Sequence, residues 1–175
     1  MRLLLICLLF IFSLSAQPLL FPKKATKLYG FVNAEGDWKI KPQFERATTF
    51  KAAFSLVRSN GLWGMIDEDG DYRIRPLYQS LQHIASGLIL AQNQQGLYGY
   101  LDNQGLEVIE PQFERAYSFV GRTARVQNKG KWNLINRQGE PLLKEAVEAI
   151  KSLKKGRFLL RDKSLYGLAN NKGQV

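Results

Sequence analysis

Few residues in this sequence have the types and spacing that catalysis or metal binding requires. His83 is the only histidine and Cys7 is the only cysteine. A lone histidine is more often a packing or surface residue than a general base, and a zinc site needs several His or Cys ligands. The sequence also has no glycine-rich phosphate loop and no nucleophile elbow. It therefore predicts no catalytic residue, no metal site and no cofactor.

The acidic segment 67–71 (DEDGD) is similar to the start of a calcium-binding loop. Such a loop needs a bidentate glutamate at its twelfth position, where this chain has Tyr78. The segment also falls at a turn position of the repeat described below. A turn is therefore the better interpretation.

Three glutamates, Glu45, Glu114 and Glu148, occupy equivalent positions of that repeat. Glycoside hydrolysis needs two carboxyl groups roughly 5–10 Å apart, and stacked copies of one position could bring two of them together. The pairs Glu45-Arg46 and Glu114-Arg115 are more typical of ion pairs. We therefore keep a hydrolase acting on an envelope or extracellular polymer only as the alternative to a non-catalytic protein.

The N-terminus has the pattern of a secretory signal peptide. Arg2 precedes an apolar run at residues 3–12, and small residues follow at positions 13, 15 and 16. The run is shorter than the about 20 apolar residues of a membrane span. We expect cleavage after Ala16 or Ser15 and a periplasmic, cell-surface or extracellular location, with an uncleaved anchor as the alternative.

The mature chain would be basic and free of thiols. Cys7 lies inside the apolar run, so lipidation and disulfides are not expected. Removing residues 1–16 from the 175 leaves 159, the length of one domain, with 24 Lys and Arg against 15 Asp and Glu. A net charge of +9 favours anionic partners. Because the charge is spread along the chain and the cluster at 151–157 is short, no specific nucleic-acid binding is expected.

The strongest pattern is an internal repeat. An aromatic residue followed by glycine recurs at steps of 34 or 35 residues, with Trp132-Asn133 as a degenerate copy. Asn or Asp follows each aromatic residue after four positions, and glycine follows it after seven. The segment PQFERA occurs at 42–47 and again at 111–116, a spacing of two units. The repeat anchors are Tyr29, Gly30, Gly36, Pro42, Trp63, Gly64, Gly70, Pro76, Tyr98, Gly99, Gly105, Pro111, Trp132, Gly139, Tyr166, Gly167 and Gly173.

Each unit is predicted to contain three short antiparallel strands and a connector. In the second copy the strands are 54–57, 62–67 and 72–76, and Pro76 is expected to end the third. Asn or Asp opens the turn between the second and third strands, and glycine closes it. Side chains alternate in the middle strand, with Trp63 and Met65 facing one way and Gly64 and Ile66 facing the other. The glycine is expected to let another backbone approach closely.

One unit cannot bury its own apolar face, so the units must stack. We predict an all-β fold with a lead-in at 17–28 and a repeat domain at 29–175 of roughly four and a half units. The first unit lacks a leading strand and the last lacks its third strand. We expect a curved open array, with closure into a propeller-like ring as the alternative. Residues 141–156 contain helix formers, and a short helix is predicted near 143–154.

The pattern of aromatic-Gly, Asx, Gly and Ile-x-Pro resembles the WG β-repeat family of bacterial proteins. The copies WGMIDEDGDYRIRPLY (63–78) and YGYLDNQGLEVIEPQF (98–113) carry the resemblance, which extends over about residues 29–173. Asn133 and Glu145 depart from the pattern in the fourth copy. The resemblance implies a β-rich repeat array and implies no reaction, because catalytic residues do not define the family.

The sequence as a whole favours an exported, non-catalytic binding or scaffold protein at the cell envelope or outside the cell. The expected partner is an unidentified protein or glycan, or an anionic surface, and the mature chain is not expected to span a membrane. A binding protein predicts an exposed surface where residues that vary between units cluster. An enzyme predicts instead that Glu45 and Glu114 converge in one cleft.

Overall fold

The computed structural model of the chain describes residues 19–51, 53–82 and 87–175. The predicted signal peptide at 1–16 and His83 lie outside these residues. Within them, no helix is long and apolar enough to cross a membrane.

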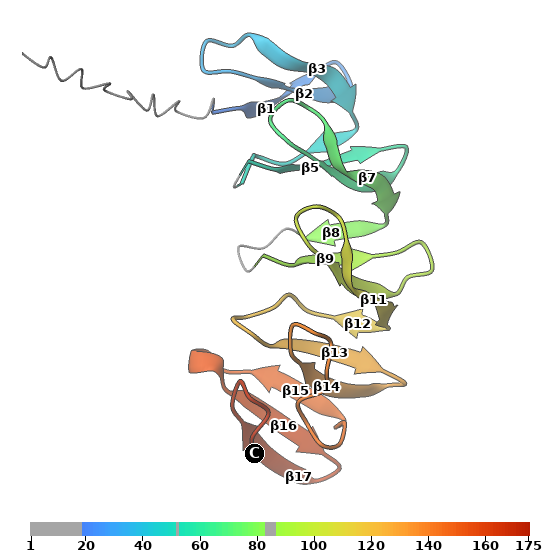
Figure 1. The fold of residues 1–175 in the computed structure, drawn as a ribbon, viewed down its shortest axis with the longest axis vertical. Helices are drawn as coiled ribbons and strands as arrows, with labels where there is room; N and C mark the ends of the chain where they lie inside the picture. The colour runs from blue at the N-terminus through green and yellow to red at the C-terminus, as the bar shows by residue number, and fades with distance from the viewer. Residues whose placement is uncertain (1–18, 52, 83–86) are drawn as a thin grey trace, which may run out of the picture.

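The described residues form five antiparallel sheets, which Figure 1 shows stacked in one column. We number them from the N-terminal end. Sheet 1 contains β1 (Phe21–Ala25), β2 (Leu28–Val32) and β3 (Trp38–Phe44). Sheet 2 contains β4 (Arg46–Ala47), β5 (Ser55–Ser59), β6 (Leu62–Ile66) and β7 (Tyr72–Tyr78). Sheet 3 contains β8 (Ser80–Gln82), β9 (Ile89–Gln92), β10 (Tyr98–Leu101) and β11 (Glu107–Phe113).

Sheets 4 and 5 have three strands each among the described residues. Sheet 4 contains β12 (Arg115–Ala116), β13 (Ala124–Asn128) and β14 (Lys131–Ile135). Sheet 5 contains β15 (Ala149–Ser152), β16 (Phe158–Asp162) and β17 (Leu165–Ala169). A short 3-10 turn, η1 (Lys154–Gly156), lies between β15 and β16.

The array is open, as expected. In the part of the chain that the structure describes, β1 pairs with β2 and β17 pairs with β16, but β1 and β17 do not pair with each other. These two strands lie at opposite ends of the column in Figure 1. The all-β fold and the 34-residue unit are confirmed, and the ring is excluded.

Four apolar cores lie between consecutive sheets of the described column. Side chains alternate between the two faces of each middle strand, so one strand contributes to two cores. In β6, Met65 faces sheet 3 and Ile66 faces sheet 1. Each sheet inside the column is therefore buried on both faces, as the need to stack predicts. From the N-terminal end, the cores contain Phe31, Phe44 and Val57; Met65, Ile74 and Ile89; Tyr100, Phe113 and Val126; and Leu134, Phe158 and Leu160.

The predicted turns form as the Asx and glycine positions require. The Asp67 carboxylate accepts hydrogen bonds from the backbone N–H groups of Asp69 at 3.1 Å and Asp71 at 2.9 Å. Gly70 has a φ of +90°, a left-handed conformation that glycine adopts without steric cost. The side chain of Asn33 makes the equivalent bond to the N–H of Asp37 at 2.8 Å. The turn interpretation of 67–71 is thus confirmed over a calcium loop.

Glycine and proline of the repeat lie opposite each other across a β-bulge. Trp63 pairs with Tyr78 and Met65 with Ile74, so one residue of β6 faces three residues of β7. A Cβ on Gly64 would lie 2.6 Å from the Ile74 carbonyl oxygen, which confirms that the glycine permits close backbone approach.

The expectation that proline ends the third strand is wrong. Strand β7 continues past Pro76 to Tyr78, and β3 and β11 likewise continue past their prolines. Proline is tolerated here because it lies at a bulge of an edge strand, where the missing N–H breaks no ladder bond.

Each connector supplies a fourth strand that pairs with the next unit. The short strand β4 follows β3 in the sequence but pairs with β5 of sheet 2. Strands β8, β12 and β15 make the same exchange in sheets 3, 4 and 5. The first unit also has a leading strand, contrary to expectation, because β1, which lies within the lead-in segment, pairs with β2.

The predicted helix near 143–154 is absent, and backbone pairing takes its place. Trp132 N–H donates to the Val147 carbonyl at 2.7 Å and Val147 N–H donates back at 2.9 Å, while residues 149–152 form β15. Helix propensity is a weak preference that tertiary pairing overrides. Asn133 accounts for the missing third strand of this unit. In the first three units a third strand packs against the glycine of the middle strand, whereas here the Asn133 side chain accepts a hydrogen bond from the Leu143 N–H at 3.1 Å.

Candidate functional site

The glutamates of the PQFERA segments bind hairpin turns of their own sheets. Both Glu45 carboxylate oxygens accept from the Gly61 N–H at 3.2 Å. The Glu114 carboxylate accepts from the N–H groups of Lys129 and Gly130, both at 3.1 Å. These turns belong to sheets 2 and 4, with sheet 3 between them. The arrangement expected of a hydrolase, Glu45 and Glu114 in one cleft, does not occur.

The predicted ion pairs within the PQFERA segments are also not the observed ones. The nearest cation to Glu45 is Arg58, at 3.9 Å, and not Arg46. In the second copy Gln79 donates to the Gln94 carbonyl at 3.0 Å, and in the fourth Glu148 lies 4.0 Å from Arg161. In the first three copies, this position of the repeat therefore binds the turn between the leading and middle strands.

The outer strands β3, β7 and β11 carry exposed charges. Lys41, Arg75 and Glu110 occupy corresponding positions, whereas Lys39 and Arg73 correspond to Val108 and Glu107 lies one residue earlier. Charged side chains on an edge strand oppose pairing with another chain. At the corresponding positions a charge is kept while its sign changes along the column, so edge protection accounts for these residues.

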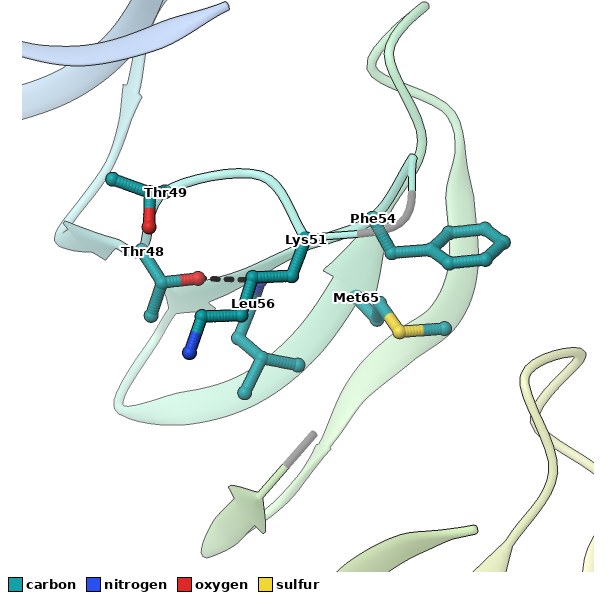
Figure 2. Close-up of a pocket in the computed structure, with 6 residues that line it drawn as sticks. All are labelled: Thr48, Thr49, Lys51, Phe54, Leu56 and Met65. Carbon is teal, nitrogen blue, oxygen red and sulfur yellow. Dashed lines mark hydrogen bonds between the residues drawn. The ribbon is translucent and has the colours of Figure 1, made fainter. Parts of the chain in front are cut away.

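The connectors between the fourth and leading strands form small clefts. Figure 2 shows the one in sheet 2, about 70 Å³ in volume, lined by Thr48, Lys51 and Phe54 among others. The Thr48 hydroxyl accepts a hydrogen bond from the Leu56 N–H at 3.0 Å and also contacts the Ser55 hydroxyl. This polar group is thus occupied within the protein, and the cleft is too small for an organic ligand.

The corresponding connector of sheet 4 opens a larger cleft of about 350 Å³, which reaches sheets 3 and 5. Such a volume lies at the lower end of the about 300–1,000 Å³ usual for ligand pockets. The described residues that line it include no Asp, Glu or His. Its polar and aromatic lining consists of Gln82 and Tyr98 from sheet 3, Tyr117, Ser118, Thr123 and Arg125 from sheet 4 and its connector, and Ser152 and Phe158 from sheet 5.

Arg125 occupies a position that is leucine in three other units and Pro22 in the first. It pairs with Leu134 in the register in which Leu56 pairs with Met65, Leu90 with Tyr100 and Leu159 with Leu168. Its cross-strand neighbour is Tyr117, whose N–H donates to the Arg125 carbonyl at 3.0 Å. Thr48 makes the same backbone bond to Leu56 in sheet 2. An arginine and a tyrosine therefore replace a leucine and a threonine at one cross-strand pair.

The cation is held in place by a ring and a carbonyl. The Arg125 guanidinium carbon lies 4.0 Å from the Tyr117 ring centroid, and one Nη1–H donates to the Ile150 carbonyl at 2.8 Å. Tyr117 is held in turn by the buried Tyr100, whose hydroxyl donates to the Tyr117 carbonyl at 2.7 Å. Burial raises the pKa of the Tyr100 hydroxyl well above its ordinary value, so it is a hydrogen-bond donor at neutral pH. Arg125 and Tyr117 are thus both held by contacts within the protein.

Sequence reasoning missed Arg125 and Tyr117 because it followed the positions that agree between copies. The sequence does mark this site, at a position where one copy differs from the others: Arg125 stands where three other copies have leucine. Natural sequences break their own local rules most often at functional sites. The predicted anchors, by contrast, lie in turns, bulges or sheet interfaces, except for Tyr166 and Gly167 on the terminal strand β17, where Tyr166 is 69% exposed.

Fold and cleft together define an open β-repeat protein built from small stacked sheets. The profile of the WG containing repeat matches residues 29–63, 63–96 and 98–132. The chain therefore belongs to the WG containing repeat family, as its resemblance implied. No curated protein matches the sequence.

Among solved structures, the chain is similar to Hsv2 of Kluyveromyces lactis with loop 6CD replaced by a Gly-Ser linker. The TM-score is 0.53 at 11% identity, over 90% of this chain and 60% of that chain. It is also similar to BamB from Moraxella catarrhalis, with a TM-score of 0.43 at 14% identity over 86% of this chain and 53% of that one. At these identities the likeness concerns the fold alone, and the chain spans only 53–60% of the length of these structures.

Proposed function

We propose that this protein is an exported, non-catalytic binding protein of the cell envelope or the extracellular space. It would use the connector side of the array to hold its ligand. The observation that carries the proposal is the cleft at Tyr117 and Arg125, where residues that vary between units meet from three sheets. A cation stacked on an aromatic ring, with no Asp, Glu or His among the described residues that line the cleft, is suited to recognition more than to proton transfer.

Export is tested by expressing the full chain with its own N-terminus in a bacterial host and sequencing the N-terminus of the product. The pattern of residues 1–16 supports a product that begins at Gln17 or Ala16 and is found outside the cytoplasm. A product that begins at Met1 and stays in the cytoplasm would contradict export.

Binding without catalysis is tested with residues 17–175 and a panel of purified envelope polysaccharides and peptides. We expect saturable binding to at least one of them, weakened by substitution in the Tyr117–Arg125 cleft, with the ligand recovered intact. Release of shorter products, detected as new reducing ends or free amines, would favour the hydrolase. If no substitution on the connector side changes the affinity for the ligand, the binding site must lie on another surface.

A further inference from the structure

Positive and negative charges are mixed along the sequence, but the fold places them on different parts of the array. Each fourth strand, its connector and the following leading strand form a hairpin, which we call a connector hairpin, at 46–58, 80–92, 115–127 and 149–161. Together the four contain eleven Lys or Arg and no Asp or Glu, although the chain has 15 acidic residues. The acids lie in the turns, in the third strands and at the residues flanking the hairpins. The connector ends of these hairpins are therefore cationic, whereas Arg58 and Arg161 at the opposite ends lie beside Glu45 and Glu148.

The connectors of these hairpins lie on the same flank of the column. In Figure 1, segment 117–123 and η1 lie at the left of the column, whereas the turns between leading and middle strands lie at the right. The exposed cations at the connectors are Lys51 in sheet 2, Arg122 beside sheet 4, and Lys151, Lys154, Lys155 and Arg157 in sheet 5 and its connector. A chain-like anion lying along this flank would meet positive charge over most of its length.

The cleft between sheets 3, 4 and 5 adds specificity to this charge. A guanidinium has five N–H donors, and among the described residues Arg125 gives one of them, to the Ile150 carbonyl. Stacking on Tyr117 occupies one flat face of the guanidinium and leaves its N–H edge available. A planar fork of this kind suits the two oxygens of a carboxylate better than a spherical charge.

The rest of the lining suits a sugar ring. Tyr98 is half-buried in the cleft and offers aromatic surface to the C–H face of a pyranose. Tyr117 is 49% exposed, but Arg125 stacks on its ring and the Trp132 ring centroid lies 5.8 Å from its own, so Tyr117 positions the guanidinium instead. The side chains of Gln82, Ser118 and Ser152 line the cleft and make no hydrogen bond with other described residues. They provide donors and acceptors for ring hydroxyls. The volume of about 350 Å³ accommodates one or two sugar residues and not a protein segment with bulky side chains.

We propose that the connector side binds an acidic polysaccharide and that the cleft holds one of its sugar acids, with the carboxylate on Arg125 and the sugar ring against Tyr98. This inference rests on the proposed binding function and names its ligand class. Lys51, Lys151 and Lys154 would contact neighbouring residues of the polymer through charge alone. The cleft then supplies the preference for a carboxylated sugar over other anions.

The test compares four probes by titration calorimetry with residues 17–175: polygalacturonate, neutral dextran, polyphosphate and vesicles rich in an anionic phospholipid. We expect polygalacturonate to bind most tightly. Arg125→Leu should weaken that binding at least tenfold while changing polyphosphate binding by less than threefold. Because leucine is the residue of three other units at this position, the variant should fold normally, which circular dichroism and thermal unfolding will check.

Arg125→Lys keeps the charge but removes the fork, so it should recover only part of the affinity for polygalacturonate. Arg75→Leu is the matched control, because it removes the same charge from an exposed position on β7, away from the connectors. It should leave the affinity for polygalacturonate unchanged.

Two outcomes would overturn the sugar-acid inference while leaving a binding function intact. One is equal loss of polyphosphate and polygalacturonate affinity in Arg125→Leu, which would show charge recognition only. The other is dextran or lipid vesicles binding as tightly as polygalacturonate. Failure of the wild-type chain to bind any of the four probes would overturn the inference too. The proposed function itself fails only if the wider panel of polysaccharides and peptides also gives no binding.

Discussion

The close contact between Gly64 and β7 gives a prediction with a built-in control. A Cβ at residue 64 would lie 2.6 Å from the Ile74 carbonyl oxygen and 2.9 Å from the Pro76 nitrogen. Since real Cβ contacts are not shorter than 3.0 Å, Gly64→Ala must displace β7 by at least 0.4 Å, the difference of these distances, or break its pairing with β6. The obstacle is backbone, which cannot rotate away as a side chain can.

We expect Gly64→Ala to lower the free energy of unfolding by about 2 kcal/mol, within the 1–3 kcal/mol that overpacking usually costs. For a chain of this length, that corresponds to a fall in Tm of roughly 4–8 °C. Urea unfolding of residues 17–175, followed by far-UV circular dichroism, measures the change. The m value should stay the same, since the surface exposed on unfolding does not change.

Gly167→Ala is the control, because Gly167 occupies the same position of the repeat in β17. A Cβ there would meet only Val175 Cγ1, at 3.3 Å, a side-chain atom that can move. We expect no loss, or a gain of up to about 1 kcal/mol, because alanine is less flexible than glycine in the unfolded chain. Equal losses in the two variants would refute the reasoning, since the third strand would then not be the reason for the glycine.

Two further predictions follow from buried and turn-binding groups. Because burial holds the pKa of Tyr100 above its ordinary value, the unfolded chain loses this proton first, so the free energy of unfolding should fall as pH rises above about 10. Tyr100→Phe should make that fall less steep and should cost about 1 kcal/mol at neutral pH through the lost bond to Tyr117; an unchanged slope in alkaline urea titrations would contradict the assignment. Glu114→Ala removes the acceptor of two backbone N–H groups and should cost about 0.5–2 kcal/mol in urea unfolding, as the loss of a helix cap does. Gln112→Ala, an exposed neighbour on β11, should cost less than about 0.5 kcal/mol, and equal effects would count against the turn-binding role.

The features that the sequence predicts correctly each have a local cause. An Asx residue and a glycine three positions later specify a turn by themselves, as at Asp67 and Gly70. Alternation in 62–67 assigns Met65 and Ile66 to opposite faces with no knowledge of the neighbouring sheets. Their recurrence at a constant step then implies stacking, because no unit can cover its own apolar face.

The features that it misses depend on contacts distant in the sequence. Strand β4 has two residues, too few for any periodic pattern, and forms only because β5 offers it an edge. The helix predicted near 143–154 fails for the same reason, since Val147 pairs with Trp132. Predicting the cleft would have needed two facts: that Arg125 is equivalent to Leu56 in the repeat, and that Ile150 of the next sheet lies close to Arg125.

The exchange of the fourth strand also governs how the gene can change in length. A deletion or duplication of one whole period, cut at equivalent points, returns a β4-like strand to a β5-like partner and restores the register of each sheet. A change of a few residues does not. The two PQFERA segments are the best-matched stretches for such an event, and recombination between them would remove or add 69 residues, two complete units. The array can therefore be lengthened or shortened in evolution without inventing a new interface, while the exceptional unit with Arg125 and Tyr117 is kept or lost as a whole.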